Sequence, residues 1–171
     1  MNLFWEQLGK EHNKASFESG TKELDDYLQT QASQDIKRFL TSVIVLTGGG
    51  DQIIGYYTLS QACMTVEHFP SNVGKKLPRK RNVPCTLLGR LAVDYRYKGQ
   101  GYGRALLHHA LTKAALISND VASYCVIVDA KDARAKDFYV RHGFIELVNQ
   151  PLRLFIPLKG VREVIDLWHQ A

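Results

Sequence analysis

The residues with the clearest chemical potential form a glycine-rich turn, Lys98-Gly99-Gln100-Gly101-Tyr102-Gly103-Arg104. The turn follows an apolar, strand-like stretch and precedes a helix-like one, and its glycines allow a tight turn with positive φ. The first N–H groups of a helix have no intrahelical partner, and the helix dipole is positive there. The turn therefore predicts a pyrophosphate site to which Lys98 and Arg104 add positive charge.

The spacing of the glycines discriminates between phosphate ligands. A nucleoside-triphosphate loop ends in Gly-Lys-Ser/Thr, which is missing from this turn. A dinucleotide-binding fold needs GxGxxG spacing and an acidic residue on the next strand, whereas this turn has Gly-x-Gly-x-Gly followed by Arg104. A glycine turn without any ligand is the remaining alternative.

Charge is distributed unevenly along the 171 residues, whose net charge is +5. Between His68 and Asn119, ten basic residues stand against one acidic residue, Asp94. Five of the ten lie in the run that we name the basic loop, Lys75–Arg81. A solvated loop and a phosphate-binding surface are equally good interpretations of this run by itself.

Hydrophobic periodicity predicts strands that alternate with helices, which is typical of the α/β or α+β class. We expect one helix over 21–39, whose buried stripe includes Tyr27 and Phe39, and a helix of about four turns after the glycine turn, with Ile117 on its core side. Further helices are predicted at 132–141 and 161–168, and strands at 41–47, 52–64, 85–94, 123–128, 144–147 and 153–158. Because no repeat or linker interrupts this pattern, we expect a single domain over 1–171.

The cysteines and the N-terminus indicate the cellular setting. Cys63, Cys85 and Cys125 are odd in number and lack CxxC spacing, so we expect buried free thiols in a reducing compartment. The histidines have no metal-ligand spacing, and we expect no metal site. Since neither a signal peptide nor a bilayer-length apolar run is visible, the sequence predicts a cytoplasmic protein with no membrane contact.

Two separate motifs resemble the GNAT superfamily of acetyl-CoA-dependent N-acetyltransferases. Residues 98–103 are similar to its Arg/Gln-x-x-Gly-x-Gly/Ala pattern, with Lys98 in the place of Arg or Gln, and residues 135–144 are similar to its A-x-x-F-Y-x-x-x-G-F pattern. The resemblance extends from about Leu40 to Leu158. It implies a central mixed, mostly antiparallel β-sheet flanked by helices, with acetyl-CoA in the cleft between the central strands.

The resemblance also implies a set of cofactor-binding residues on the central strand, the glycine turn and the following helix. These residues are Leu91, Ala92, Val93, Lys98, Gly99, Gln100, Gly101, Tyr102, Gly103, Arg104, Asp132, Ala135 and Phe138. The family often has Asn where this chain has Asp132, and capping of the helix is the alternative role for this carboxylate.

A narrower resemblance lies near the N-terminus. Residues 17–28 are similar to the F-x-C-G-x-x-x-L-D-x-Y/F-L signature of one GNAT branch, with Ser19 in the place of Cys, and residues 55–60 and 88–94 also resemble that branch. Its members are toxins of bacterial toxin–antitoxin pairs that acetylate the α-amino group of aminoacyl-tRNA. The resemblance implies aminoacyl-tRNA, a ribbon-helix-helix antitoxin and a second copy in a homodimer as partners, with DNA contacted only through the antitoxin. An ordinary capped amphipathic helix is the alternative for residues 17–28.

The resemblance matches Tyr139 to the family's general acid, which protonates the departing thiolate. The pKa of a phenol, about 10, is comparable with that of a thiol. A core aromatic residue is the alternative for Tyr139. The implied tRNA-binding residues are Lys75, Lys76, Arg79, Lys80, Arg81 and Arg90.

Residues 86–93 of the predicted central strand carry no carboxylate, although Arg90 lies among them. A lysine amine has a pKa of about 10.4 and must lose a proton before it reacts, whereas an α-amine near 8 needs little help. The missing base therefore favours an aminoacyl ester as the acceptor, and a base from elsewhere, Asp94 included, is the alternative. An acetyltransferase for a small amine or a protein amine, and a non-catalytic CoA-binding or RNA-binding module, are the competing functions.

Overall fold

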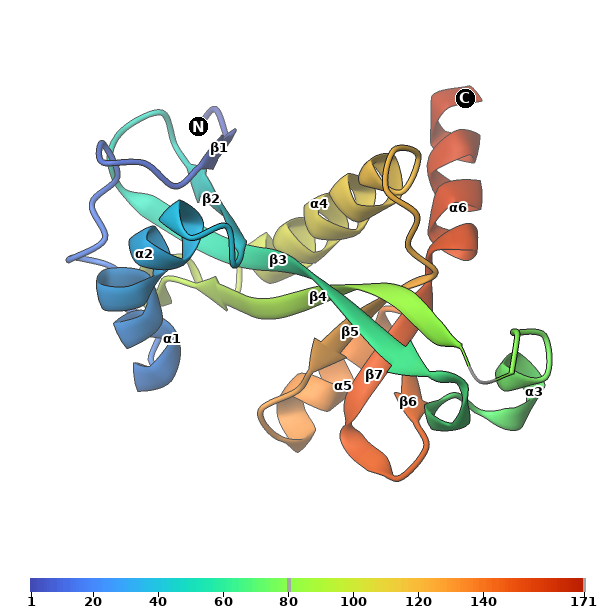
Figure 1. Ribbon diagram of the computed structural model, residues 1–171. Helices are drawn as coiled ribbons and strands as arrows, with labels where there is room; N and C mark the ends of the chain where they lie inside the picture. Colours follow the sequence, from blue (N-terminus) through green and yellow to red (C-terminus); the bar gives the residue numbers. More distant parts are fainter. Residues whose placement is uncertain (80, 171) are drawn as a thin grey trace. The chain divides into compact units, whose positions relative to one another are not determined.

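The computed structural model describes residues 1–79 and 81–170, with side chains described through Ile165 (Figure 1). Lys80, one of the implied tRNA-binding residues, lies outside the described residues. The chain divides into two compact units, Met1–Ser60 with Gly89–Ala110, and Gln61–Leu88 with the chain from Leu111 onward. A single GNAT domain over residues 1–171 stays a prediction.

Seven strands are hydrogen-bonded in the order β1-β2-β3-β4-β5-β7-β6. The β4–β5 pair is parallel, whereas the pairs β1–β2, β2–β3, β5–β7 and β6–β7 are antiparallel, so the mixed, mostly antiparallel sheet is confirmed. The strands are β1 (Phe4–Gln7), β2 (Ser42–Thr47), β3 (Ile53–Thr65), β4 (Asn82–Val93), β5 (Cys125–Asp129), β6 (Ile145–Leu147) and β7 (Gln150–Pro157). The sequence missed β1 because this short edge strand is largely exposed and shows no buried alternation.

In the first unit, the predicted N-terminal helix consists of α1 (Lys22–Asp26), a π-helical segment Tyr27–Gln31 and α2 (Ala32–Lys37). A 3₁₀ turn, Tyr95–Tyr97, precedes the glycine turn, and α4 (Tyr102–Ile117) follows it. α4 continues into the second unit, where Ile117 is 44% exposed. The prediction that Ile117 faces the core is therefore wrong, because this residue is the last of the helix.

In the second unit, helical segments precede or follow the strands along the chain. A 3₁₀ turn, Val66–His68, and α3 (Ser71–Gly74) lead into the basic loop, α5 (Ala133–Arg141) follows β5, and α6 (Leu158–Gln170) follows β7. Asp132 caps α5 as predicted, because its carboxylate accepts a hydrogen bond of 2.8 Å from the Ala135 N–H. Gly143 has a φ of +93° directly after that helix, as expected for a glycine that ends it.

The N-terminal signature folds into a hydrogen-bonded turn before α1. The Asp25 carboxylate accepts hydrogen bonds from Ser19 N (2.8 Å) and Ser19 Oγ (2.6 Å), and Ser19 Oγ accepts one from Thr21 N (3.1 Å). Gly20 takes a φ of +87° between them. Ser19 stands where the branch signature has Cys. It is buried, and its hydroxyl is satisfied by the hydrogen bond to Asp25.

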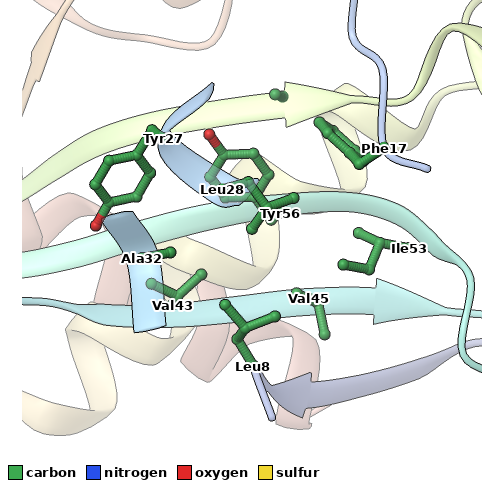
Figure 2. Close-up of a cluster of buried hydrophobic side chains, with 10 residues drawn as sticks. Leu8, Phe17, Tyr27, Leu28, Ala32, Val43, Val45, Ile53 and Tyr56 are labelled. Carbon is green, nitrogen blue, oxygen red and sulfur yellow. The ribbon is translucent and has the colours of Figure 1, made fainter. Parts of the chain in front are cut away.

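The core of the first unit lies between the N-terminal helical segment and the strands (Figure 2). Tyr27, Leu28 and Ala32 pack there against Val43, Val45 and Tyr56 of β2 and β3. Phe39, predicted to join this stripe, is instead 96% exposed. α2 has already ended at Lys37, and Phe39 takes a φ of +56°, which turns its side chain out of the helical register.

The core of the second unit joins side chains from β3, β4, β5 and β7, including Met64, Cys85, Cys125 and Phe155. Cys85 and Cys125 are buried free thiols whose sulfur atoms lie 3.5 Å apart. Cys63 is exposed, so the prediction of three buried thiols is wrong for this residue, which faces outward from β3.

The described residues contain neither a membrane-spanning helix nor a cluster of metal ligands. No helix among them has the length and apolarity needed to cross a bilayer. Likewise, that part of the chain gathers no group of three or more His, Cys, Asp or Glu side chains able to hold a metal ion.

Candidate functional site

The glycine turn has the backbone geometry that a phosphate cradle needs. Gly99 and Gly101 have φ values of +74° and +85°, which favour glycine. A Cβ built at either position would meet nothing within 4 Å, so the space above both residues is open. Lys98 and Arg104 are exposed at the two ends of the turn. These features fit a diphosphate group at the start of α4.

A buried ion pair fixes the residues that precede this turn. The Asp94 carboxylate is 0% exposed and accepts hydrogen bonds from Arg96 Nε (2.8 Å), Arg96 Nη2 (2.9 Å), Arg96 N (3.0 Å) and Glu18 N (3.1 Å). Tyr95 N donates in return to the Glu18 carbonyl over 2.8 Å. The carboxylate therefore joins the N-terminal segment to the start of the turn.

These donors also decide the protonation of Asp94. Burial by itself raises the pKa of a carboxyl group, but the hydrogen bonds from Arg96 and Glu18 outweigh it and hold the pKa of Asp94 below its ordinary value. Both carboxylate oxygens of Asp94 are therefore occupied by donors that hold the turn in place. A general-base role for Asp94 stays an untested alternative.

Residues 91–93 end β4 next to the turn. Ala92 is buried against the core of the first unit, whereas Leu91 and Val93 are half-buried. A Cβ at Gly103 would lie 3.9 Å from Val93 Cγ2, so the strand end and the first turn of α4 are neighbours. Pairing of this strand with a pantetheine arm stays a prediction.

Arg90 packs over an aromatic ring. Its Cζ atom lies 3.4 Å from the centroid of the buried Tyr27 ring, which is a close cation–π contact. The Tyr27 hydroxyl donates a hydrogen bond of 3.0 Å to Asp35 of α2. Burial, together with this bond, raises the pKa of Tyr27 to about 12, so the phenol stays neutral at physiological pH.

In the second unit, α5 and its N-cap carry four of the implied site residues, Asp132, Ala135, Phe138 and Tyr139. Asp132 is exposed at the N-cap and Ala135 is half-buried. Phe138 is half-buried and packs on Tyr139, with 5.2 Å between ring centroids, and on His142, with 4.6 Å.

Tyr139 is 8% exposed, and its ring also contacts Phe144, with centroids 5.4 Å apart. Burial raises the pKa of Tyr139 to about 12. The expectation that its acidity is comparable with that of a thiol therefore needs correction, because this phenol is the weaker acid by about three pKa units. The hydroxyl keeps its proton across the physiological range.

The described cations of the basic loop, Lys75, Lys76, Arg79 and Arg81, are all exposed. Within the residues for which side chains are described, no ion pair engages any of the four. Their exposure is compatible with both interpretations of the loop, and it leaves them accessible to an anionic partner from solution.

The structure therefore separates the predicted residues into two groups. The first unit brings together Arg90, Leu91, Ala92, Val93, Lys98, Gly99, Gln100, Gly101, Tyr102, Gly103 and Arg104. The second unit carries the basic loop, which precedes β4 in the sequence. It also carries α5, with Asp132 at its N-cap and Ala135, Phe138 and Tyr139 within the helix. Sequence reasoning missed the contribution of Tyr27 and Asp35 to the setting of Arg90, and the only available signal was a lone arginine inside an apolar strand.

Comparison with known proteins identifies the family. Residues 41–146, more than half of the chain, match the acetyltransferase (GNAT) domain. The chain belongs to the GNAT acetyltransferases. It is 31% identical over 150 residues to the tRNA-acetylating toxin of Mycobacterium tuberculosis, covering 88% of this chain and 89% of that toxin. It is also 26% identical over 162 residues to the probable toxin TacT of Sinorhizobium fredii, covering 90% of each.

Solved structures of toxins share the fold along nearly the whole chain. A tyrosine-to-phenylalanine mutant of KacT has a TM-score of 0.90 and 30% identity, covering 96% of this chain and 99% of KacT. AtaT complexed with acetyl-methionyl-tRNAfMet has a TM-score of 0.88 and 30% identity, with coverage of 96% and 99%. An AtaT mutant bound to acetyl-CoA and the C-terminus of the antitoxin AtaR has a TM-score of 0.81 and 27% identity, with coverage of 95% and 98%.

Proposed function

We propose that this protein is a toxin that transfers the acetyl group of acetyl-CoA to the α-amino group of an aminoacyl-tRNA and thereby blocks translation. The observation that carries the proposal is the likeness to AtaT complexed with acetyl-methionyl-tRNAfMet, which covers 96% of this chain with a TM-score of 0.88. The open glycine turn, the neutral buried phenol and the exposed basic loop support the same activity.

The glycine turn and the end of β4 are the residues that would hold acetyl-CoA. Backbone N–H groups of the glycine turn would bind the diphosphate, Lys98 and Arg104 would offset its charge, and residues 91–93 would pair with the pantetheine arm. When bound, acetyl-CoA supplies an activated acetyl thioester. Asp132 contributes as the helix cap, whose carboxylate occupies the Ala135 N–H.

Tyr139 has the proton that acetyl transfer requires. As the bond between the acetyl carbon and the acceptor nitrogen forms and the carbon–sulfur bond breaks, the departing thiolate gains negative charge. The Tyr139 hydroxyl would donate a hydrogen bond and then its proton to that sulfur, while the proton that the acceptor nitrogen loses returns to the phenolate through solvent. Because burial keeps the phenol protonated, the donor is available at every physiological pH.

The charged groups near β4 favour one class of acetyl acceptor. Residues 86–93 include no carboxylate, and the nearby Asp94 is fully occupied by Arg96 and Glu18. An amine that is mostly protonated at neutral pH has no base to deprotonate it there, whereas the α-amine of an aminoacyl ester is largely neutral. This absence of a base on β4 supports an aminoacyl ester over a lysine side chain.

The partners follow from the same proposal. A toxin of this kind is neutralised by an antitoxin, and the AtaT complex with the AtaR C-terminus supports an antitoxin for this chain. We extend the proposal to an antitoxin of the ribbon-helix-helix type, to DNA contact only through that antitoxin, to a homodimer and to a cytoplasmic location.

The direct test is acetyl transfer to charged tRNA. The protein is incubated with labelled acetyl-CoA and a mixture of aminoacyl-tRNAs, and acetylated aminoacyl-adenosine is sought after nuclease digestion. We expect labelled product from at least one aminoacyl-tRNA. Labelling of free amines or lysine peptides with no product from any aminoacyl-tRNA contradicts the proposal and supports the small-amine or protein-amine acceptor.

The basic loop provides a second discrimination. Replacing Lys75, Lys76, Arg79, Lys80 and Arg81 with Ala should cause a large, salt-sensitive loss of transfer to tRNA, because each phosphate contact adds to the slope of affinity against salt. Transfer that is unchanged in this variant at every salt concentration favours an acceptor without a polyanionic body.

A further inference from the structure

Arg90 has an unusual environment for a cation inside a strand. Its Cζ atom lies over the buried Tyr27 ring, 3.4 Å from the ring centroid, and the residue is half-buried. Within the part of the chain whose side chains are described, no hydrogen bond or ion pair uses its N–H groups. A guanidinium that is stacked on one face keeps its N–H edge available for a planar, bidentate contact with a phosphate.

The stacking partner is itself held in place from two sides. The Tyr27 hydroxyl donates to Asp35 over 3.0 Å, and the ring is packed in the core of the first unit beside Leu28 and Tyr56 (Figure 2). Tyr27 opens the π-helical segment, in which the Ala32 N–H bonds to the Tyr27 carbonyl. Such single π-helical turns are often found at functional sites.

Arg90 also has a defined place along β4. It directly precedes residues 91–93, the strand end proposed for the pantetheine arm, on the side away from the glycine turn. If the diphosphate binds at the turn, as proposed, the thioester would lie further along β4 in the direction of Arg90. Arg90 and Ala92 share one face of β4, because side chains two residues apart in a strand point the same way.

We infer that Arg90, fixed by Tyr27 and Asp35, binds the phosphodiester on the 5′ side of the terminal nucleotide that carries the aminoacyl ester. This inference rests on the proposed function and names a residue that determines acceptor specificity. Every aminoacyl-tRNA has this phosphate at a constant number of bonds from its reactive amine, whatever the amino acid. Lysine side chains and free amino acid esters lack it, and Arg90 therefore selects for a nucleotide-borne amine.

Short acceptors separate this phosphate from the rest of the tRNA. The full-length protein is assayed with 3′-O-aminoacyl-adenosine and with the same compound carrying a 5′-phosphate, and kcat/KM is measured for each. We expect the wild-type protein to prefer the phosphorylated acceptor by about tenfold or more, as for loss of one charge-assisted hydrogen bond. In Arg90→Gln and Arg90→Lys the preference should fall close to one.

Two variants test the role of the ring. Tyr27→Phe keeps the ring and loses the bond to Asp35, so it should retain most of the preference. Tyr27→Leu removes the ring and should lose the preference to the same extent as Arg90→Lys, and the double variant Tyr27→Leu/Arg90→Lys should lose no more than either alone. Arg38→Gln, at an exposed residue after α2, is the matched control and should behave as wild type.

Binding gives a readout independent of turnover. Calorimetry without acetyl-CoA, using a non-hydrolysable 3′-aminoacylamido-adenosine 5′-phosphate, should show weaker binding to Arg90→Lys than to wild type by about tenfold. In a separate titration, acetyl-CoA affinity should stay unchanged. A loss of acetyl-CoA affinity in Arg90→Lys, or an unchanged preference for the 5′-phosphate, overturns the inference. If the wild-type protein acetylates no aminoacyl-tRNA at all, the proposed function has failed instead, and the two failures are distinguishable.

Discussion

Asp94 and Tyr139 are both buried acids, but their surroundings move the two pKa values in opposite directions. Burial disfavours the ionised form of each group. Asp94 receives hydrogen bonds from Arg96 and Glu18, which keep it ionised, whereas the Tyr139 ring is surrounded by Phe138 and Phe144, which keep it neutral. Asp94 therefore stabilises the fold as an anion, whereas Tyr139 stays protonated and can act as a proton donor.

Asp94→Asn should destabilise the protein by about 2 kcal/mol at pH 7, because a neutral amide at this buried position loses the charge-assisted hydrogen bonds from Arg96 and Glu18. The folded pKa of Asp94 lies below the unfolded value, so its stabilisation is present above about pH 4 and is lost as the pH falls through the folded pKa. Urea unfolding at pH 7, 5 and 3.5 measures this. The gap between wild type and variant should be constant at pH 7 and 5 and should begin to narrow only at pH 3.5.

Exposed Asp120→Asn is the control for this prediction and should change stability by less than about 0.5 kcal/mol. A gap between wild type and Asp94→Asn that widens on acidification contradicts the assignment of Asp94 as an ionised, structural carboxylate.

Tyr139→Phe should lower kcat by about 10² to 10⁴, because the variant keeps the ring and loses the proton donor. Acetyl-CoA affinity and thermal stability should change little. In the wild type, kcat should show no fall between pH 8 and 10 from loss of the phenol proton, since the pKa of Tyr139 is about 12. Tyr124→Phe, in the same unit, is the matched control, and an equal loss of kcat in both variants speaks against a proton donor at position 139.

At the scale of elements, local patterns predicted more than tertiary contacts could. The glycine turn, the Asp132 cap and the helix end at Gly143 depend on neighbouring residues, and all three were predicted correctly. Hydrophobic periodicity wrongly placed Phe39 and Ile117 on the core side of their helices, because periodicity carries no information about where a helix ends. The stacking of Arg90 on Tyr27 joins residues far apart in sequence, so no local pattern announced it.

Gly101→Ala tests the glycine turn as an element. Alanine at a φ of +85° costs about 1 kcal/mol, and its methyl group would project into the open space proposed for the diphosphate. We expect acetyl-CoA affinity to fall by about tenfold or more in calorimetry. Gly49→Ala, at a φ of +93° in the β2–β3 turn, carries similar strain and should leave that affinity intact. Equal losses in both variants contradict a cradle at Gly101.

For the whole molecule, the net charge of +5 conceals different uses of the basic residues. Arg96 is paired with Asp94, Arg90 lies on Tyr27, and the basic loop faces solvent. The sequence could predict that cations are concentrated in the middle of the chain. It could not predict which are already satisfied, since that depends on the side chains brought to them by folding.

The buried tyrosines make the stability of the whole chain sensitive to alkaline pH. Burial raises the pKa of both Tyr27 and Tyr139 to about 12 and raises the pKa of Tyr56 and Tyr57 as well. The unfolded chain ionises near pH 10, so stability is fully present below pH 10 and is lost as the pH rises towards 12. A phenol with this gap contributes at most about 2 to 3 kcal/mol to that loss.

The measurement is the free energy of unfolding in urea from pH 8 to pH 11.5, with phenolate absorbance followed in parallel. Because the four phenols are shielded in the folded chain, most of their absorbance change should coincide with unfolding rather than precede it. Tyr139→Phe should flatten the decline in stability with pH, whereas Tyr95→Phe, at an exposed ring, should leave it unchanged. A phenolate titration that is complete near pH 10 while the protein is still folded contradicts the burial of these side chains, and with it the neutral proton donor on which the proposed chemistry depends.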